Sequence, residues 1–135
     1  MKKLRVLVVD DNRSAAETLS LFFKLEGHDA ETAFDGEEAV AAVRTDSGCP
    51  FDVIVMDIGM PRLDGCEAAG RIREHLGERA PVLVALTGWN TEEDIARTRA
   101  AGFVEHLVKP VDPATLRDLL AKLDVGDAGP SEPAG

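Results

Sequence analysis

The sequence predicts an α/β fold in which a parallel β-sheet is covered by helices on both faces. Short apolar runs rich in β-branched residues recur along the chain, segments with helical periodicity lie between them, and the two kinds of segment alternate five times. The strongest apolar runs are continuous rather than alternating, which is typical of strands buried on both faces. Crossovers between the parallel strands are expected to be right-handed.

Five strands are expected, at residues 4–9, 29–33, 53–56, 82–86 and 104–108, of which the second and fifth are the weakest runs. The first run superficially resembles a signal peptide because two lysines precede it. It is short, however, and it ends in two aspartates with no small-residue cleavage site behind it. We therefore interpret it as a buried strand.

Five helices are expected, near residues 13–26, 36–46, 65–75, 92–101 and 113–123. Asp35 and Asp64 are each followed three residues later by a glutamate, which is the capping-box pattern. Asp112 precedes a proline, which is a strong helix start signal. The first helix is expected to begin at Asn12 and to end at Gly27.

The composition predicts one domain over residues 1–123 and a flexible tail or linker over 124–135. The chain has 135 residues, of which 44% are hydrophobic and 30% charged, a balance typical of a globular domain. No apolar run approaches the roughly 18 residues that a membrane span needs. The last ten residues, GDAGPSEPAG, are small, polar and interrupted by glycine and proline.

The net charge of −10 argues against direct contact with nucleic acid or with a membrane, because an acidic surface repels phosphate groups. Cys49 and Cys66 show neither metal-ligand spacing nor a disulfide framework, so we interpret them as free thiols in a reducing cytoplasm. We expect His28 and His75 to be solvated and assign them no role.

Polar residues follow four of the predicted strands. Asp10 and Asp11 follow the first, Asp57 the third, Thr87 the fourth and Lys109 the fifth. Because the carboxyl ends of parallel strands meet at one edge of a sheet, and ligands bind there in open α/β sheets, these side chains are expected to converge.

Such a cluster requires a cation. Two carboxylates 4 Å apart repel each other by roughly 4 kcal/mol at an effective dielectric constant near 20. Hard oxygen ligands suit Mg²⁺, while a lysine and a hydroxyl can contact a bound phosphoryl group. Phosphoryl transfer depends mostly on positioning and charge stabilisation, and these residue types supply both.

Four segments together resemble the signature of the receiver domains of two-component response regulators. They are VVDDN (8–12), VMDIGMPRLDG (55–65), ALTG (85–88) and LVKP (107–110), and the resemblance covers residues 4 to about 123. It implies a flavodoxin-like, doubly wound (βα)5 fold with strand order 2-1-3-4-5. It also implies a phosphorelay protein of the cytoplasm.

The resemblance implies that Asp57 is the phosphoacceptor, which takes a phosphoryl group from a histidine kinase or a histidine phosphotransfer protein. Asp11 and Asp57 would bind Mg²⁺ directly, with the Gly59 carbonyl as a further ligand and Asp10 acting through water. The chain would therefore be a regulatory phosphoacceptor that catalyses only its own phosphorylation and slow dephosphorylation, not an enzyme with a separate substrate.

The remaining roles follow from the same resemblance. Lys109 would contact the phosphoryl oxygens, with a cis bond before Pro110, and Thr87 would be the switch hydroxyl that moves toward the phosphate. The added charge of a phosphoryl group, roughly −1.5 to −2, attracts a nearby hydroxyl and cation.

Three positions depart from the family pattern. His106 replaces the usual aromatic switch residue three positions before the lysine, and its switching role is left open against that of a partly exposed histidine. Gly59 and Trp89 occupy the two positions that tune phosphate lifetime. Neither offers a group to orient an attacking water, so we expect slow self-dephosphorylation.

The resemblance implies an output face over residues 91–123 that binds a downstream protein. Two contexts are left open, a single-domain regulator and a receiver excised from a hybrid kinase or larger regulator. A phosphohydrolase is disfavoured because no Asp-X-Asp motif follows the first strand, and an electron carrier because no phosphate-cradling loop does. The cognate kinase, target, signal and oligomeric state cannot be inferred from the residues.

Overall fold

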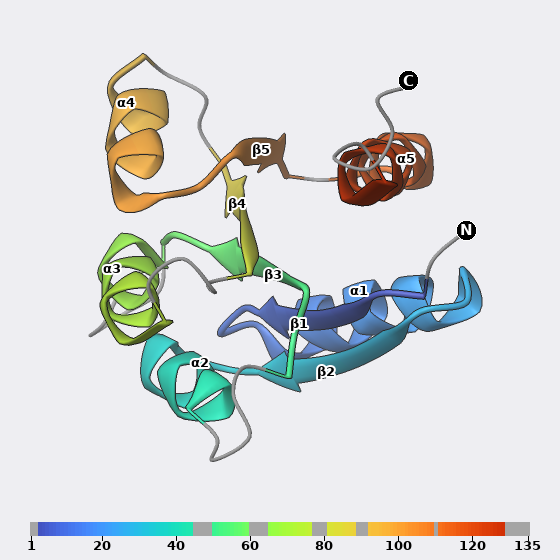
Figure 1. Cartoon of the computed structure of the whole chain (residues 1–135), viewed down its shortest axis with the longest axis horizontal. Helices are drawn as coiled ribbons and strands as arrows, with labels where there is room; N and C mark the ends of the chain where they lie inside the picture. The colour runs from blue at the N-terminus through green and yellow to red at the C-terminus, as the bar shows by residue number, and fades with distance from the viewer. Residues whose placement is uncertain are drawn as a thin grey trace.

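The computed structural model describes residues 3–44, 50–59, 65–76, 81–88, 92–109 and 111–128, with side chains described to residue 123. Strands and helices alternate along the whole of this chain (Figure 1). Their bounds are β1 Arg5–Val9, α1 Arg13–Leu25, β2 Asp29–Ala33, α2 Gly36–Val43, β3 Val53–Asp57, α3 Gly65–Leu76, β4 Val82–Thr87, α4 Glu92–Ala101, β5 Glu105–Val108 and α5 Pro113–Ala128.

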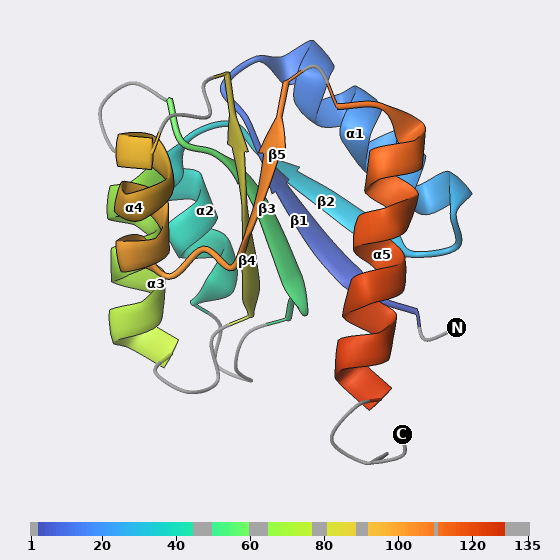
Figure 2. The ribbon, with the colours of Figure 1, turned by 90° about the horizontal axis from the view of Figure 1, so that it is seen from above.

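The five strands form one parallel sheet in the order β2-β1-β3-β4-β5, which confirms the predicted fold. Helices α1 and α5 cover one face, and α2, α3 and α4 cover the other (Figure 2). The register aligns Val8 with Val55 and Val55 with Val84. The carboxyl ends of β1, β3 and β4 therefore lie at the same edge.

Alternate residues of each central strand face opposite layers, which explains the continuous apolar runs. Leu7, Ile54 and Leu83 belong to a buried cluster with residues of α2 and α3. Their neighbours Val8 and Val55 belong to a second cluster with residues of α1 and α5. Each face of the sheet thus has its own hydrophobic core, and together they hold the strand ends in place.

The helix starts follow the predicted caps where the structure describes them. The side-chain oxygen of Asn12 accepts a hydrogen bond from the Ala15 N–H at 3.1 Å, and that of Asp35 accepts one from the Glu38 N–H at 2.8 Å. Asp112 caps α5 through the Thr115 N–H at 2.8 Å. The predicted cap at Asp64 lies outside the described residues.

Two helix ends differ from the prediction by more than one residue. Helix α2 ends at Val43 rather than at residue 46, because the Arg44 N–H turns to the Ala41 carbonyl in a tighter final turn. Helix α5 continues to Ala128 rather than ending at 123, so it enters the segment predicted as tail. Its extension includes Gly126, which helices tolerate at a cost of about 1 kcal/mol relative to alanine.

The prediction that His28 is solvated is wrong. Its side chain is 4% exposed, and its Nδ1 accepts a hydrogen bond from the Leu4 N–H at 2.9 Å. The bond arises because the Asp29 N–H pairs with the Leu4 carbonyl, which brings the start of β2 against the start of β1. His75 is exposed, as predicted.

Cys66 is partly buried, carries no disulfide and packs against the cluster under α2 and α3. Cys49 lies outside the described residues. No helix in the described part of the chain has both the length and the apolar character needed to cross a bilayer.

Candidate functional site

The predicted site residues gather at the carboxyl edge of the sheet. Asp10 follows β1, Asp57 is the last residue of β3, Thr87 is the last residue of β4 and Lys109 follows β5. Four strands that are distant in sequence thus each deliver one polar side chain to the same edge, which confirms the predicted convergence.

Three carboxylates form the centre of this site. Asp10, Asp11 and Asp57 each offer a carboxylate oxygen, and these oxygens all lie within 4.8 Å of one another. Asp10 and Asp57 are buried, with 2% and 8% of their surface exposed, whereas Asp11 is exposed. Two carboxylates of the cluster are therefore shielded from water, and the third is open to it.

Lys109 neutralises part of this charge. Its Nζ lies 3.1 Å from Oδ2 of Asp10 and 3.1 Å from Oδ2 of Asp57, forming an ion pair with each. Burial by itself would lower the pKa of Lys109, but hydrogen bonds to Asp10 and Asp57 and the charges of both carboxylates offset it. The pKa of Lys109 is accordingly raised above its ordinary value.

Backbone groups fix the two buried carboxylates. The Gly59 N–H donates to Oδ1 of Asp57 at 2.9 Å, and the Asn12 N–H donates to Oδ1 of Asp10 at 3.0 Å. In each carboxylate one oxygen is thus held by the loop that follows its strand, while the other faces Lys109. Sequence reasoning missed the part played by Asn12, which it treated only as a helix start.

Thr87 is 2% exposed and lies beside these groups at the end of β4. Its carbonyl accepts the Lys109 N–H at 2.9 Å, so the backbone that carries the lysine is tied directly to the threonine. The short link couples the predicted switch residue to the predicted phosphate ligand.

His106 lies away from the acidic cluster. It aligns with Ala85 in the register of β4 and β5, and its Nε2 contacts Oγ1 of Thr98 on α4. Thr98 is completely buried, and its hydroxyl also reaches the carbonyls of the preceding helical turn. Burial and the nearby charge of Arg99 lower the pKa of His106, and Glu105 opposes them.

No sequence signal singled out Thr98, because its role depends on how α4 is rotated against the sheet. Gly59 is exposed next to the acidic cluster, and its effect on phosphate lifetime stays a prediction. Trp89 and Pro110, as well as Met60, lie outside the described residues.

In the described part of the chain, one cavity adjoins the site and another lies at a distance from it. A groove of about 780 Å³ between α1 and α5 is lined at one end by Asp10, Asn12 and Lys109 and farther along by Phe22 and Leu116. The groove therefore joins an apolar wall of α1 and α5 to Asp10 and Lys109.

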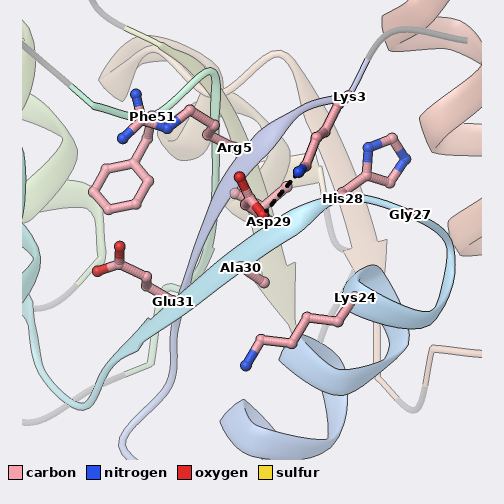
Figure 3. Close-up of a pocket in the computed structure, with 10 residues that line it drawn as sticks. Lys3, Arg5, Lys24, Gly27, His28, Asp29, Ala30, Glu31 and Phe51 are labelled. Carbon is pink, nitrogen blue, oxygen red and sulfur yellow. Dashed lines mark ion pairs between the residues drawn. The ribbon is translucent and has the colours of Figure 1, made fainter.

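The other cavity, of about 540 Å³, lies at the starts of β1 and β2 (Figure 3). Its cations do not converge: Lys3 pairs with Asp29 at 3.4 Å, and the charged ends of Arg5 and Lys24 point in different directions. It contains none of the predicted site residues.

The donor set fits a divalent cation. Three carboxylates, of which one is exposed, offer hard oxygen ligands with room for water, which is the coordination that Mg²⁺ prefers. A lysine next to them supplies a second, fixed positive charge. The arrangement can therefore stabilise a phosphoryl group placed on the Oδ2 side of Asp57.

Comparison with known proteins gives the same picture. Residues 6–121 match the family model of the response regulator receiver domain. The response regulator MprA of Mycobacterium avium is 36% identical over 120 residues, which are 89% of this chain and 49% of that protein. The chain thus spans about half the length of the curated relatives that it matches.

Solved structures agree in fold. The chemotaxis protein CheY4 of Vibrio cholerae is 32% identical, with a TM-score of 0.81 over 90% of this chain and 98% of that one. The receiver domain of a sensor histidine kinase from Pseudomonas aeruginosa is 29% identical, with a TM-score of 0.75 over 90% and 97% of the two chains. Its structure has a magnesium ion coordinated in the active site cleft.

Proposed function

Because this chain belongs to the response regulator receiver domain family of two-component signalling, we propose that it carries a phosphoryl group on Asp57. The donor is the phosphohistidine of a histidine kinase or a histidine phosphotransfer protein. The observation that carries the proposal is the position of Asp57, whose Oδ2 lies 3.1 Å from Lys109 within a cluster of three carboxylates.

In the proposed reaction, a carboxylate oxygen of Asp57 attacks the phosphorus atom of the donor. An O–P bond forms, the N–P bond of the phosphohistidine breaks, and the donor's imidazole nitrogen keeps the electron pair. Lys109 already lies at the Oδ2 face of Asp57 and contacts the transferred oxygens. The hydrogen bond from Gly59 to Oδ1 orients the carboxylate so that Oδ2 faces Lys109.

We assign the Mg²⁺ site to Asp11 and Asp57 as direct ligands, with the Gly59 carbonyl as a further ligand and Asp10 acting through water. The acidic cluster supports this assignment, as does the magnesium ion in the Pseudomonas receiver. When bound, Mg²⁺ neutralises charge on the phosphoryl group during transfer.

Signal output is proposed to start at Thr87, whose hydroxyl moves toward the phosphoryl group, and to reach the face formed by α4, β5 and α5. Two exposed apolar side chains support this face as a protein contact: Val104 is 64% exposed and Val108 is 41% exposed. β5 is the edge strand of the sheet and lies between α4 and α5 (Figure 1).

The test is intact-mass measurement after incubation with Mg²⁺ and acetyl phosphate. Wild-type protein is expected to gain one phosphoryl group, and both Asp57→Asn and a chelator should abolish the gain. Asp112→Asn is the matched control, because Asp112 is an exposed helix cap and asparagine caps equally well. An adduct that persists in Asp57→Asn would contradict the proposed acceptor.

A further inference from the structure

Arg13 occupies an unusual position next to the acidic site. It is the first residue of α1, it is exposed, and its guanidinium carbon lies 4.1 Å from the centre of the Phe34 ring. This distance is within the range of a cation–π interaction, which favours an arginine stacked on an aromatic ring. The ring therefore restrains a side chain that would otherwise sample many rotamers.

Both partners lie at the carboxyl edge of the sheet. Arg13 follows Asp11 by two residues, and Phe34 directly follows Ala33, the last residue of β2. The Ala33 carbonyl accepts the Asp10 N–H at 3.1 Å, so the chain that carries Phe34 is tied to the chain that carries the carboxylates. The stacked guanidinium accordingly lies over the residue that follows β2, next to the loop that carries Asp10 and Asp11.

Glu38 is the carboxylate next to this contact, because its Oε1 accepts the Phe34 N–H at 2.9 Å. Within the described ranges, no ion pair involves Arg13, and the N-terminus of a helix disfavours a cation by about 0.3–1 kcal/mol. Lys109 differs because two carboxylates hold it from 3.1 Å on either side. The charge of Lys109 is thus paired with carboxylates of the site, whereas Arg13 is exposed.

We propose that Arg13 is a positioning residue that draws anionic phosphoryl donors to Asp57 and weakens Mg²⁺ binding at the same site. An anion approaching a chain with a net charge of −10 is repelled overall, and a restrained cation next to the loop that carries Asp10 and Asp11 lowers that repulsion locally. The same cation repels Mg²⁺. The proposed effect on phosphoryl donors rests on the proposed phosphorylation of Asp57, whereas the proposed effect on Mg²⁺ binding does not.

The expected changes in Mg²⁺ affinity and in phosphorylation rate go in opposite directions. This distinguishes them from the effect of a loss of structure, which would lower both. Removing the cation should tighten Mg²⁺ binding and slow phosphorylation by an anionic donor at subsaturating concentration. A substitution that merely disturbed the edge of the sheet would weaken both. The charge-conserving Arg13→Lys should retain most of both wild-type properties, because lysine also interacts with an aromatic face.

The experiment compares wild type, Arg13→Gln and Arg13→Lys by calorimetric titration with MgCl₂ and by the initial rate of acetyl phosphate labelling, followed by intact mass. We expect Arg13→Gln to lower the Mg²⁺ dissociation constant about two- to fivefold and to slow labelling about two- to fivefold. Both differences should shrink at high salt.

Arg117→Gln is the matched control. Arg117 also stacks on a phenylalanine, with its guanidinium carbon 5.8 Å from the Phe22 ring centre, but it pairs with Glu26 beyond the other end of α1. The substitution Arg117→Gln removes the same unit of charge and should change neither the Mg²⁺ dissociation constant nor the labelling rate. An unchanged or larger Mg²⁺ dissociation constant in Arg13→Gln would overturn the proposal. If wild type bound Mg²⁺ without being labelled, the proposed function would fail while the Mg²⁺ comparison still tested Arg13.

Discussion

The Nζ of Lys109 lies 3.1 Å from Oδ2 of Asp57, so that an ion pair joins the end of β5 to the end of β3. The same nitrogen lies 3.1 Å from Asp10. Lys109 is therefore the cation paired with both buried carboxylates before any phosphoryl group arrives.

Substitution Lys109→Met should destabilise the metal-free protein by about 1–3 kcal/mol, because it leaves Asp10 and Asp57 buried without their partner. Urea unfolding measures this change. Mg²⁺ should restore more stability to the variant than it adds to wild type. Lys122→Met is the control, since Lys122 forms an exposed pair with Glu105 and should change stability by less than about 1 kcal/mol. Equal costs for the two variants would contradict the assigned role of Lys109.

Gly65 and Gly70 form a matched pair within α3. A Cβ at Gly65 would lie 2.6 Å from the Asp57 carbonyl oxygen and 2.6 Å from Cα of Ile58, whereas one at Gly70 would meet nothing within 4 Å. Gly65→Ala should therefore cost about 1–3 kcal/mol, since the backbone cannot yield. Gly70→Ala should stabilise the helix by about 0.5–1 kcal/mol. Thermal unfolding compares them, and a tolerated Gly65→Ala would mean that α3 is not packed this closely on β3.

His106 predicts a pH dependence of stability. Burial and Arg99 hold the pKa of His106 below its ordinary value of 6.5, with Glu105 opposing them, and Glu105 is itself paired with Lys122. The folded protein thus binds this proton more weakly than the unfolded chain. The stability contributed by the neutral ring is present above pH 6.5 and is lost as the pH falls through the lower pKa of the folded state.

Urea unfolding between pH 5 and pH 8 should show this loss in wild type, and His106→Gln should reduce it. His75→Gln should leave the profile unchanged, because that ring is exposed. A profile that is the same in wild type and His106→Gln would show that the contact with Thr98 does not depend on the protonation of His106.

Gly59 predicts the lifetime of the phosphorylated form. A Cβ at this position would lie 3.6 Å from Oδ1 of Asp57, an ordinary contact, so a side chain fits next to the acceptor. Glycine has no group to orient a water molecule, and we expect dephosphorylation over minutes or longer. Gly59→Asn places an amide there and should speed phosphate release severalfold. Release from wild type within seconds would contradict the expectation.

The sequence predicts the architecture and the central residues because both depend on local patterns. Continuous apolar runs indicate strands buried on both faces, and the polar residue that ends each run must lie at the carboxyl edge of a parallel sheet. The proximity of Asp57 and Lys109 could therefore be predicted from the sequence. The backbone hydrogen bond from Gly59 to Oδ1 of Asp57, which accompanies their 3.1 Å contact, could not be predicted in the same way.

The features that sequence reasoning missed depend on contacts between distant elements. His28 is buried because the register of β1 and β2 aims the Leu4 N–H at its ring, and no local pattern encodes that register. The contact between Thr98 and His106 depends on the rotation of α4, whose sequence has little amphipathic pattern. The Arg13 and Phe34 contact likewise joins two segments that are separated by a helix and a strand.

The most direct test of the account is to find which residue carries the phosphoryl group. Borohydride reduces an aspartyl phosphate to homoserine, so the protein can be labelled with acetyl phosphate and Mg²⁺, reduced, and mapped by peptide mass spectrometry. We predict homoserine at position 57 alone, and none when Mg²⁺ is chelated. Reduction at Asp10 or Asp11, or a phosphorylated protein with no reduced aspartate, would contradict the central claim that Asp57 is the phosphoacceptor.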